Sequence, residues 1–151
     1  MADERIRKLK PLALGISSIT ADPNYTSKFG AMLSKHIPLM DFDRRFDAGE
    51  RKRIEKHNYG LIRVILTPNG YHLYFLSVLV SFKKYLKMLE DLKADKGFIA
   101  HTKFRGYGNL RISPYFGIRT KHFKEGGHIG AWATKTPQGE IIDKILDRVV
   151  V

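Results

Sequence analysis

The sequence predicts a single α+β domain of 151 residues, in which helices pack on a central antiparallel sheet. Two β-rich runs flank a turn sequence and predict a hairpin over about 61–78. Apolar residues at helical spacing predict amphipathic helices over about 81–95 and about 137–149. Because strands and helices fall in separate runs rather than alternating along the chain, the pattern is typical of the α+β class.

The hairpin is the clearest local signal. The stretch "LIRVILTPNGYHLYFLSV" places two runs rich in branched and aromatic residues around Thr67-Pro68-Asn69-Gly70. Proline presets φ at the second turn position, and asparagine and glycine tolerate the left-handed conformation that follows it. Both faces of each run are largely apolar, so we expect the two strands at the centre of the sheet, covered on both sides.

Each predicted helix has start and stop signals. Ser81 begins the first helix and Gly97 is expected to stop it, while Thr136 is a plausible N-cap for the second, with Pro137 at its first position. The apolar stripes are Phe82, Tyr85, Leu86, Leu89 and Leu92 in the first helix and Ile141, Ile142, Ile145, Leu146 and Val149 in the second.

The remaining segments carry weaker signals. Prolines and glycines punctuate residues 11–40, so residues 1–40 are expected to form a loop-rich N-terminal arm, with at most a short helix around residues 27–36. The highly charged segment 41–58 favours a solvated helix, which Asp41 or Asp43 could cap. Between residues 98 and 135, short apolar runs separated by glycine turns predict further strands.

Composition narrows the possible functions. There is no cysteine, which excludes disulfides, thiolate catalysis, iron–sulfur clusters and cysteine-based zinc sites. The chain carries 27 Lys and Arg against 15 Asp and Glu, for a net charge of +12. An excess of this size favours a polyanionic partner, with nucleic acid first and an acidic membrane surface second, although a basic surface with no specific partner is the simplest alternative.

The basic residues concentrate in one region that also holds aromatic residues. Residues 101–139 contain seven Lys and Arg against the single acid Glu125. Single-stranded nucleic acid is bound by this combination, because cations contact phosphates and aromatic faces stack on bases. In strands alternate residues face the core, so Phe104, Phe116 and Trp132 are expected to pack there. The predicted nucleic-acid-binding residues are Lys103, Arg105, Tyr107, Arg111, Tyr115, Arg119, Lys121 and Lys124.

The predicted function is therefore non-catalytic binding of nucleic acid, with single-stranded DNA or RNA favoured and no cofactor. One alternative is a structural or assembly protein of a viral or phage particle, which would form a homo-oligomer. Another is a small nuclease that uses His72, His101 or His128 with lysines as an acid–base pair.

The six histidines raise the question of metal. His122, Glu125 and His128 are three residues apart, a spacing that suits a helix, but Gly126 and Gly127 interrupt any helix there. The "GYHLYF" segment resembles the His-hydrophobic-His strand of rolling-circle nucleases, but it contains only His72. A buried histidine bonded to a neighbour is therefore the expectation for His72.

A second resemblance concerns "RISPYFGIRTKHFKEGGHIGAWA". The segment is similar to the opening of lysostaphin-type zinc endopeptidases, in which Phe-Gly-x-Arg precedes a zinc-binding histidine; Phe116, Gly117, Arg119 and His128 match. Trp132 stands where that family has its ligand aspartate, and no His-x-His pair follows, so the resemblance does not predict a zinc site here.

No stretch reaches the ~18 apolar residues of a membrane-spanning helix. The N-terminal segment "MADERIRKLKPLALGISS" lacks the apolar core of a signal peptide. A cytoplasmic or otherwise intracellular protein without a membrane span is therefore expected.

Overall fold

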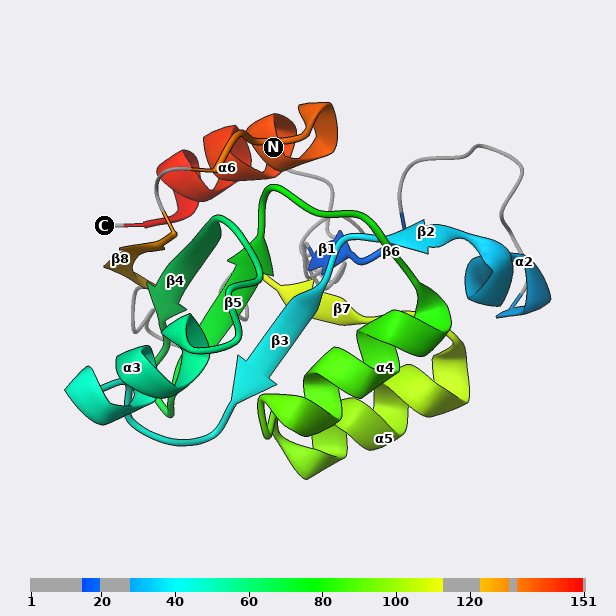
Figure 1. The fold of residues 1–151 in the computed structure, drawn as a ribbon, viewed down its shortest axis with the longest axis horizontal. Helices are drawn as coiled ribbons and strands as arrows, with labels where there is room; N and C mark the ends of the chain where they lie inside the picture. Colours follow the sequence, from blue (N-terminus) through cyan, green and yellow to red (C-terminus); the bar gives the residue numbers. More distant parts are fainter. Residues whose placement is uncertain (1–14, 20–27, 113–122, 131–132, 151) are drawn as a thin grey trace, which may run out of the picture.

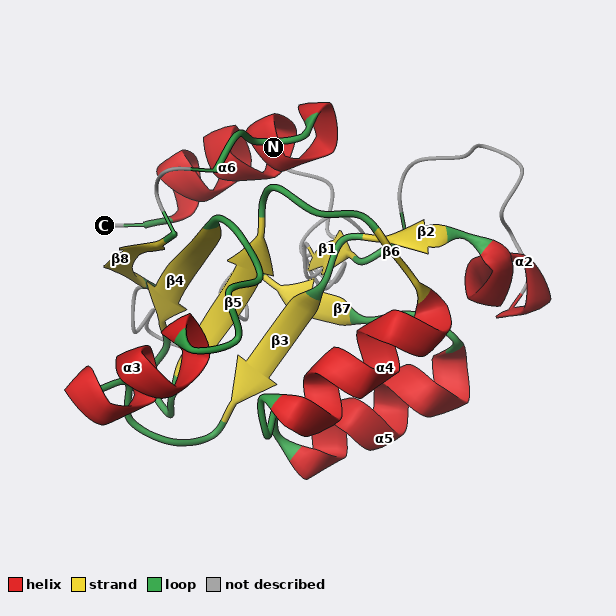
Figure 2. Ribbon diagram, in the orientation of Figure 1, coloured by secondary structure: helices red, strands yellow, loops and turns green. Residues whose placement is uncertain are grey.

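The structure is a computed structural model that describes residues 15–19, 28–112, 123–130 and 133–150. Within these ranges it contains five helices and eight strands and has the predicted α+β architecture (Figures 1 and 2). The elements are β1 (Gly15–Ser17), α2 (Lys28–Leu33), β2 (Lys35–His36), β3 (Leu39–Phe42), α3 (Ala48–Glu55), β4 (Ile62–Leu66), β5 (Tyr71–Phe75), β6 (Val80–Ser81), α4 (Phe82–Asp91), α5 (Lys96–Arg105), β7 (Asn109–Arg111), β8 (Lys124–Ile129) and α6 (Pro137–Val149).

The main sheet has the strand order β3-β5-β4-β8, and every neighbouring pair is antiparallel. The predicted hairpin is confirmed as β4 and β5, and it occupies the centre of this sheet. Thr67 N donates to Gly70 O at 2.9 Å across the turn. A Cβ at Gly70 would lie 1.8 Å from the carbonyl oxygen of Phe42, so only glycine lets the turn approach the end of β3 so closely.

Both faces of the hairpin are buried, as predicted, because side chains alternate between two cores. One core places Leu73 and Phe75 of β5 against Tyr85 and Leu89 of α4, together with residues of α3 and α5. The other core places alternate strand residues such as Tyr74 against α6, β1 and β7. The central strands are therefore covered by helices on one face and by α6 and a small second sheet on the other.

The predicted starts of α4 and α6 are confirmed. The Ser81 hydroxyl accepts from Lys84 N at 3.2 Å, and the Thr136 hydroxyl accepts from Gly139 N at 3.0 Å. Only part of the predicted apolar stripe of α6 is buried, however. Ile142 and Leu146 are buried, whereas Ile141 and Ile145 are 60% and 37% exposed.

Of the strands predicted between residues 98 and 135, β7 and β8 are present, but the first run, residues 98–104, is not a strand. Residues 96–105 form α5, because Asp95 caps its first turn by accepting from Phe98 N at 3.0 Å, and Gly106 ends it in the left-handed conformation at φ 83°. Gly97, the expected stop of the preceding helix, lies inside α5. The change from strand to helix also moves Phe104 out of the core, and its side chain is 76% exposed.

The prediction of one helix over 41–58 is also wrong in its first part. Residues 39–42 form the edge strand β3, and α3 begins only at Ala48. Asp47, rather than Asp41 or Asp43, is the N-cap and accepts from Glu50 N at 2.8 Å. The four residues of β3 are paired with β5, so tertiary pairing overrides the local helical signal.

The described part of the expected N-terminal arm contains short elements joined by loops. β2 pairs with β6, which directly precedes α4, and β1 pairs with β7, which follows α5. This segment therefore contacts both ends of the α4–α5 pair. Helix α2 lies within the short helix expected over residues 27–36. None of the helices in the described ranges has the length and apolar character needed to cross a membrane.

Candidate functional site

The predicted nucleic-acid-binding residues do not form one continuous strand surface. Lys103 and Arg105 lie on α5, Tyr107 follows it, and Arg111 and Lys124 lie at strand ends in β7 and β8. Lys103 is engaged within the fold, since its Nζ lies 3.0 Å from Glu90 Oε1. Tyr115, Arg119 and Lys121 fall outside the described residues.

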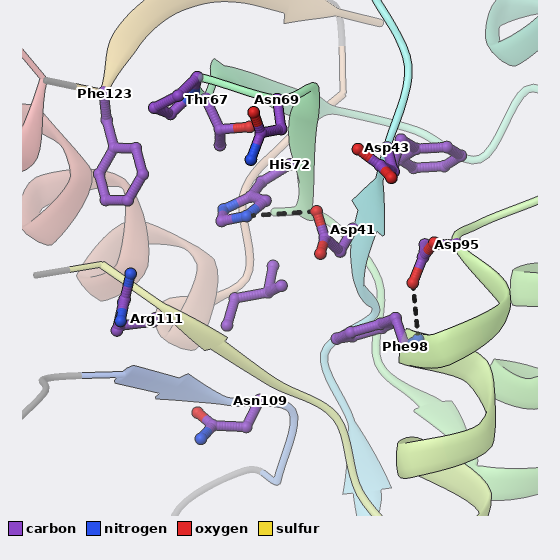
Figure 3. A pocket seen from close by; sticks show the side chains of 13 residues that line it. Asp41, Asp43, Thr67, Asn69, His72, Asp95, Phe98, Asn109, Arg111 and Phe123 are labelled. Carbon is purple, nitrogen blue, oxygen red and sulfur yellow. Dashed lines mark hydrogen bonds and ion pairs between the residues drawn. The ribbon is translucent and has the colours of Figure 1, made fainter. Parts of the chain in front are cut away.

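Arg111 lies at an open cavity of about 540 Å³ (Figure 3). The cavity lies where the β4–β5 turn, the end of β3, the start of α5 and strand β7 meet. Its lining combines acidic, basic, amide and aromatic side chains with part of the turn, namely Asp41, Phe42, Asp43, Thr67, Pro68, Asn69, His72, Asp95, Phe98, Asn109, Leu110, Arg111 and Phe123.

The pairing of β3 with β5 brings Asp41 opposite His72. Asp41 Oδ1 lies 3.5 Å from His72 Nε2, and the other ring nitrogen, Nδ1, lies 3.1 Å from the Tyr74 hydroxyl. Tyr74 is fully buried, and burial raises the pKa of its hydroxyl, so the hydroxyl keeps its proton. Because a carboxylate only accepts, we assign the proton of neutral His72 to Nε2, which faces Asp41, and Nδ1 then accepts from the Tyr74 hydroxyl.

Burial sets the charge of this pair. Burial, with a smaller contribution from Arg111, lowers the pKa of His72 to about 4. Burial also raises the pKa of Asp41 to about 6, and the neighbouring carboxylates of Asp95 and Asp43 add to this shift. At neutral pH the cavity thus contains a neutral imidazole beside an ionised carboxylate.

The charges that line the cavity lie on separate sides. Figure 3 shows Asp41, Asp43 and Asp95 together on one side, with Arg111 and Phe123 on the other and His72 between them. Asp95 is already engaged, because its Oδ2 accepts from Phe98 N to cap α5. Asp41 likewise turns Oδ1 toward His72, but its Oδ2 lies outside that contact and, with Asp43, can accept hydrogen bonds from a ligand.

The neutral lining adds stacking surfaces and further hydrogen-bonding groups. The Phe123 and His72 rings have centroids 5.9 Å apart and are mutually tilted. Asn69 in the turn and Asn109 in β7 each offer a side-chain donor and acceptor. A cavity with these groups is suited to a flat polar ligand that has an anionic end.

No metal centre is evident in the described ranges. They contain no group of three or more His, Asp or Glu side chains placed to hold a metal ion. Of the spaced triplet considered above, His122 lies outside the described residues, Glu125 pairs with Arg63 at 2.6 Å, and His128 Nε2 lies 3.6 Å from Asp143 Oδ1. Glu125 and His128 thus both contact the polar network that Arg63 and Asp143 form under α6.

Reasoning from sequence did not identify the acidic side of the cavity. The expectation that His72 is a buried strand histidine bonded to a neighbour is confirmed. For Asp41 and Asp43 the sequence suggests only a helix-capping role. The signal that could have found them is their alternate spacing after the apolar run "IPLM", which is typical of a strand end with both side chains on one face.

The chain was compared with known proteins, and no protein-family model, curated protein or solved structure matches it.

Proposed function

We propose that the protein binds single-stranded nucleic acid and that the cavity around Arg111 and His72 receives one nucleotide of the strand. The observation that carries this proposal is that Arg111, a cation expected to contact phosphate, shares a cavity with the aromatic rings of Phe98 and Phe123. The cavity volume of about 540 Å³ falls within the usual range of small-ligand sites, about 300–1,000 Å³.

The surroundings of the cavity support binding of a longer strand. Lys124 follows Phe123 directly and pairs with Leu66, next to the turn that lines the cavity. The whole chain carries a net charge of +12, which attracts a polyanion at long range. The phosphates that flank the bound nucleotide would then contact lysines and arginines outside the cavity. Such a role belongs inside the cell, where nucleic acid is present.

A single strand is favoured over a duplex because a base must leave its stack to enter a cavity. Unstacking costs a few kcal/mol in a duplex and least in a strand that is already single. Bases that stack on aromatic side chains gain roughly 1–3 kcal/mol each, whatever their sequence.

The test is binding of fluorescently labelled single-stranded RNA and DNA, and of a duplex of equal length, measured by anisotropy between ~50 and 200 mM salt. We expect affinity to fall steeply with salt and to be higher for single strands. Arg111→Gln should weaken binding and reduce the salt slope by about one phosphate contact.

The matched control is Arg148→Gln, which removes an equal charge from an exposed position on α6. Circular dichroism checks that both variants are folded. Salt-insensitive or absent binding would overturn the proposal, and an equal effect of the two variants would overturn the role of the cavity.

A nuclease is the second candidate, and the His72–Asp41 pair favours it. A carboxylate with a pKa near 6 in an open cavity is suited to accept a proton near neutral pH. Incubation with labelled RNA and DNA, with and without EDTA, tests this candidate. Cleavage that Asp41→Asn abolishes would support it, and intact substrate after prolonged incubation would exclude it.

A further inference from the structure

We propose that the cavity selects, among nucleobases, those that carry an exocyclic amino group, so that cytosine is bound in preference to uracil. This inference rests on the proposed function, because it concerns which base of a bound strand enters the cavity. It goes beyond that function because Arg111 and the aromatic rings alone would accept any nucleotide.

The first argument is the separation of charge across the cavity. Arg111 lies on one side and the carboxylates of Asp41 and Asp43 lie on the other (Figure 3). A nucleotide has the same polarity when its phosphate is at one end and a base amine at the other. A phosphate placed beside the carboxylates would be repelled, so the base edge is the part of the nucleotide that fits there.

The second argument is the hydrogen-bonding character of the carboxylates. An ionised carboxylate only accepts, so it pairs with the amino group at position 4 of cytosine and repels the carbonyl oxygen at position 4 of uracil. The two pyrimidines otherwise have the same size and backbone. The difference at this one position is therefore what the carboxylates can detect.

The third argument is that the Asp41 carboxylate is held in place. His72 is 8% exposed, its Nε2 lies 3.5 Å from Asp41 Oδ1, and its Nδ1 lies 3.1 Å from the hydroxyl of buried Tyr74. The Asp41 side chain nevertheless remains 39% exposed, so it can still reach a ligand. A fixed acceptor loses little entropy on binding and discriminates more strongly than a mobile one.

The experiment compares oligo(C) with oligo(U) RNA of equal length by competition at pH 7.5, where cytosine is neutral. It uses the full chain at one fixed salt concentration. We expect oligo(C) to bind about tenfold more tightly, as is typical of one good base-edge contact. Asp41→Asn should bring the ratio toward one, because the amide can turn its NH₂ toward the uracil oxygen.

The control is Asp91→Asn, which removes the same charge from an exposed residue at the end of α4. Asp91→Asn should strengthen binding of both oligomers equally, since it removes a negative charge, and only Asp41→Asn should change the ratio. If Asp41→Asn does not fold by circular dichroism, Asp43→Asn replaces it, with the same change in the ratio expected.

The outcomes separate the two proposals. Salt-dependent binding with equal affinity for oligo(C) and oligo(U) would overturn base selection and leave the proposed function standing. A preference that Asp41→Asn and Asp43→Asn both leave intact would also overturn it. Failure to bind either oligomer would overturn both proposals.

Discussion

The pKa values of His72 and Asp41 are shifted in opposite directions, although the two side chains are neighbours. The pKa of His72 is lowered to about 4, chiefly by burial, and burial also lowers the pKa of His36. The pKa of Asp41 is raised to about 6. Burial disfavours the charged form in all three cases, and the charged form is the protonated one for histidine and the deprotonated one for aspartate.

These shifts predict how stability depends on pH. An unfolded histidine titrates near 6.5, so acid protonates the unfolded chain first, and the contribution of His36 and His72 is lost as pH falls below about 6.5. For His72 this loss is on the order of 3 kcal/mol. Asp41 opposes it, because the folded state takes up that proton first between about pH 6 and 4.

We therefore expect the free energy of unfolding of Asp41→Asn to fall more steeply than that of the wild type between pH 6.5 and 4.5. The free energy of unfolding of His72→Gln should fall less steeply over the same range. Urea unfolding at each pH measures both. Asp91→Asn is the control for the removal of a charge and should follow the wild type. Parallel curves for Asp41→Asn and the wild type would contradict the prediction.

At the residue scale, sequence could predict the environment of His72 but not its neighbours. A histidine within an apolar strand is buried in most folds, and this needs no knowledge of the partner strand. Asp41 lies 31 positions earlier, and only the register of β3 on β5 brings the two together. No local pattern in the sequence specifies that register.

At the scale of elements, Arg63 joins three parts of the fold. It is a buried arginine on the central strand β4, and its guanidinium contacts Glu125 of β8 at 2.6 Å and Asp143 and Asp147 of α6 at 2.9 and 2.7 Å. Burial opposes the charge, but these acceptors outweigh it and raise the pKa of Arg63. Lys135 also pairs with Asp143, which is buried as well.

We expect Arg63→Met to destabilise the protein by about 1 to 3 kcal/mol, because it removes the buried guanidinium from Asp143, which keeps Lys135 as a partner. The double variant Arg63→Met, Asp143→Leu should recover a substantial part of this loss, since apolar side chains of similar volume can replace a buried ion pair. Urea unfolding measures both. A double variant less stable than Arg63→Met would contradict this account.

The elements that sequence predicted well are those whose local signals agree with their tertiary packing. In the β4–β5 hairpin, turn residues separate two apolar β-rich runs. In α4 and α6, a capping residue precedes apolar residues at helical spacing. Helix α5 is not predictable from its apolar pattern, because its sequence "KGFIAHTKFR" contains branched and aromatic residues and has no clear apolar stripe. Asp95 and Gly106 are nevertheless typical N-cap and C-cap residues, and together they favour a helix over the strand that the composition suggests.

At the scale of the whole molecule, stability is concentrated in the central strands. β4 and β5 each have hydrogen-bonded neighbours on both edges and a core on both faces. The β2–β6 and β1–β7 pairs are two and three residues long and lie outside the main sheet.

Amide hydrogen exchange should reflect this difference. We expect β4 and β5 to exchange only by global unfolding, and β2 and β6 to exchange by local opening at rates orders of magnitude higher. NMR or mass spectrometry of the exchanging protein measures both. Protection of β2 and β6 equal to that of β4 would show that the fold opens as one unit instead.

The partners of Arg63 have a consequence for how the chain is made. Its acidic partners follow it by 62, 80 and 84 positions in the sequence. When the β4–β5 hairpin has just left the ribosome, these partners have not yet been synthesised or released, so Arg63 cannot form its ion pairs. That face of the hairpin cannot close until α6 has left the exit tunnel. Synthesis therefore imposes an order on folding, in which the α3–α4 side of the sheet can form early and the α6 side must wait.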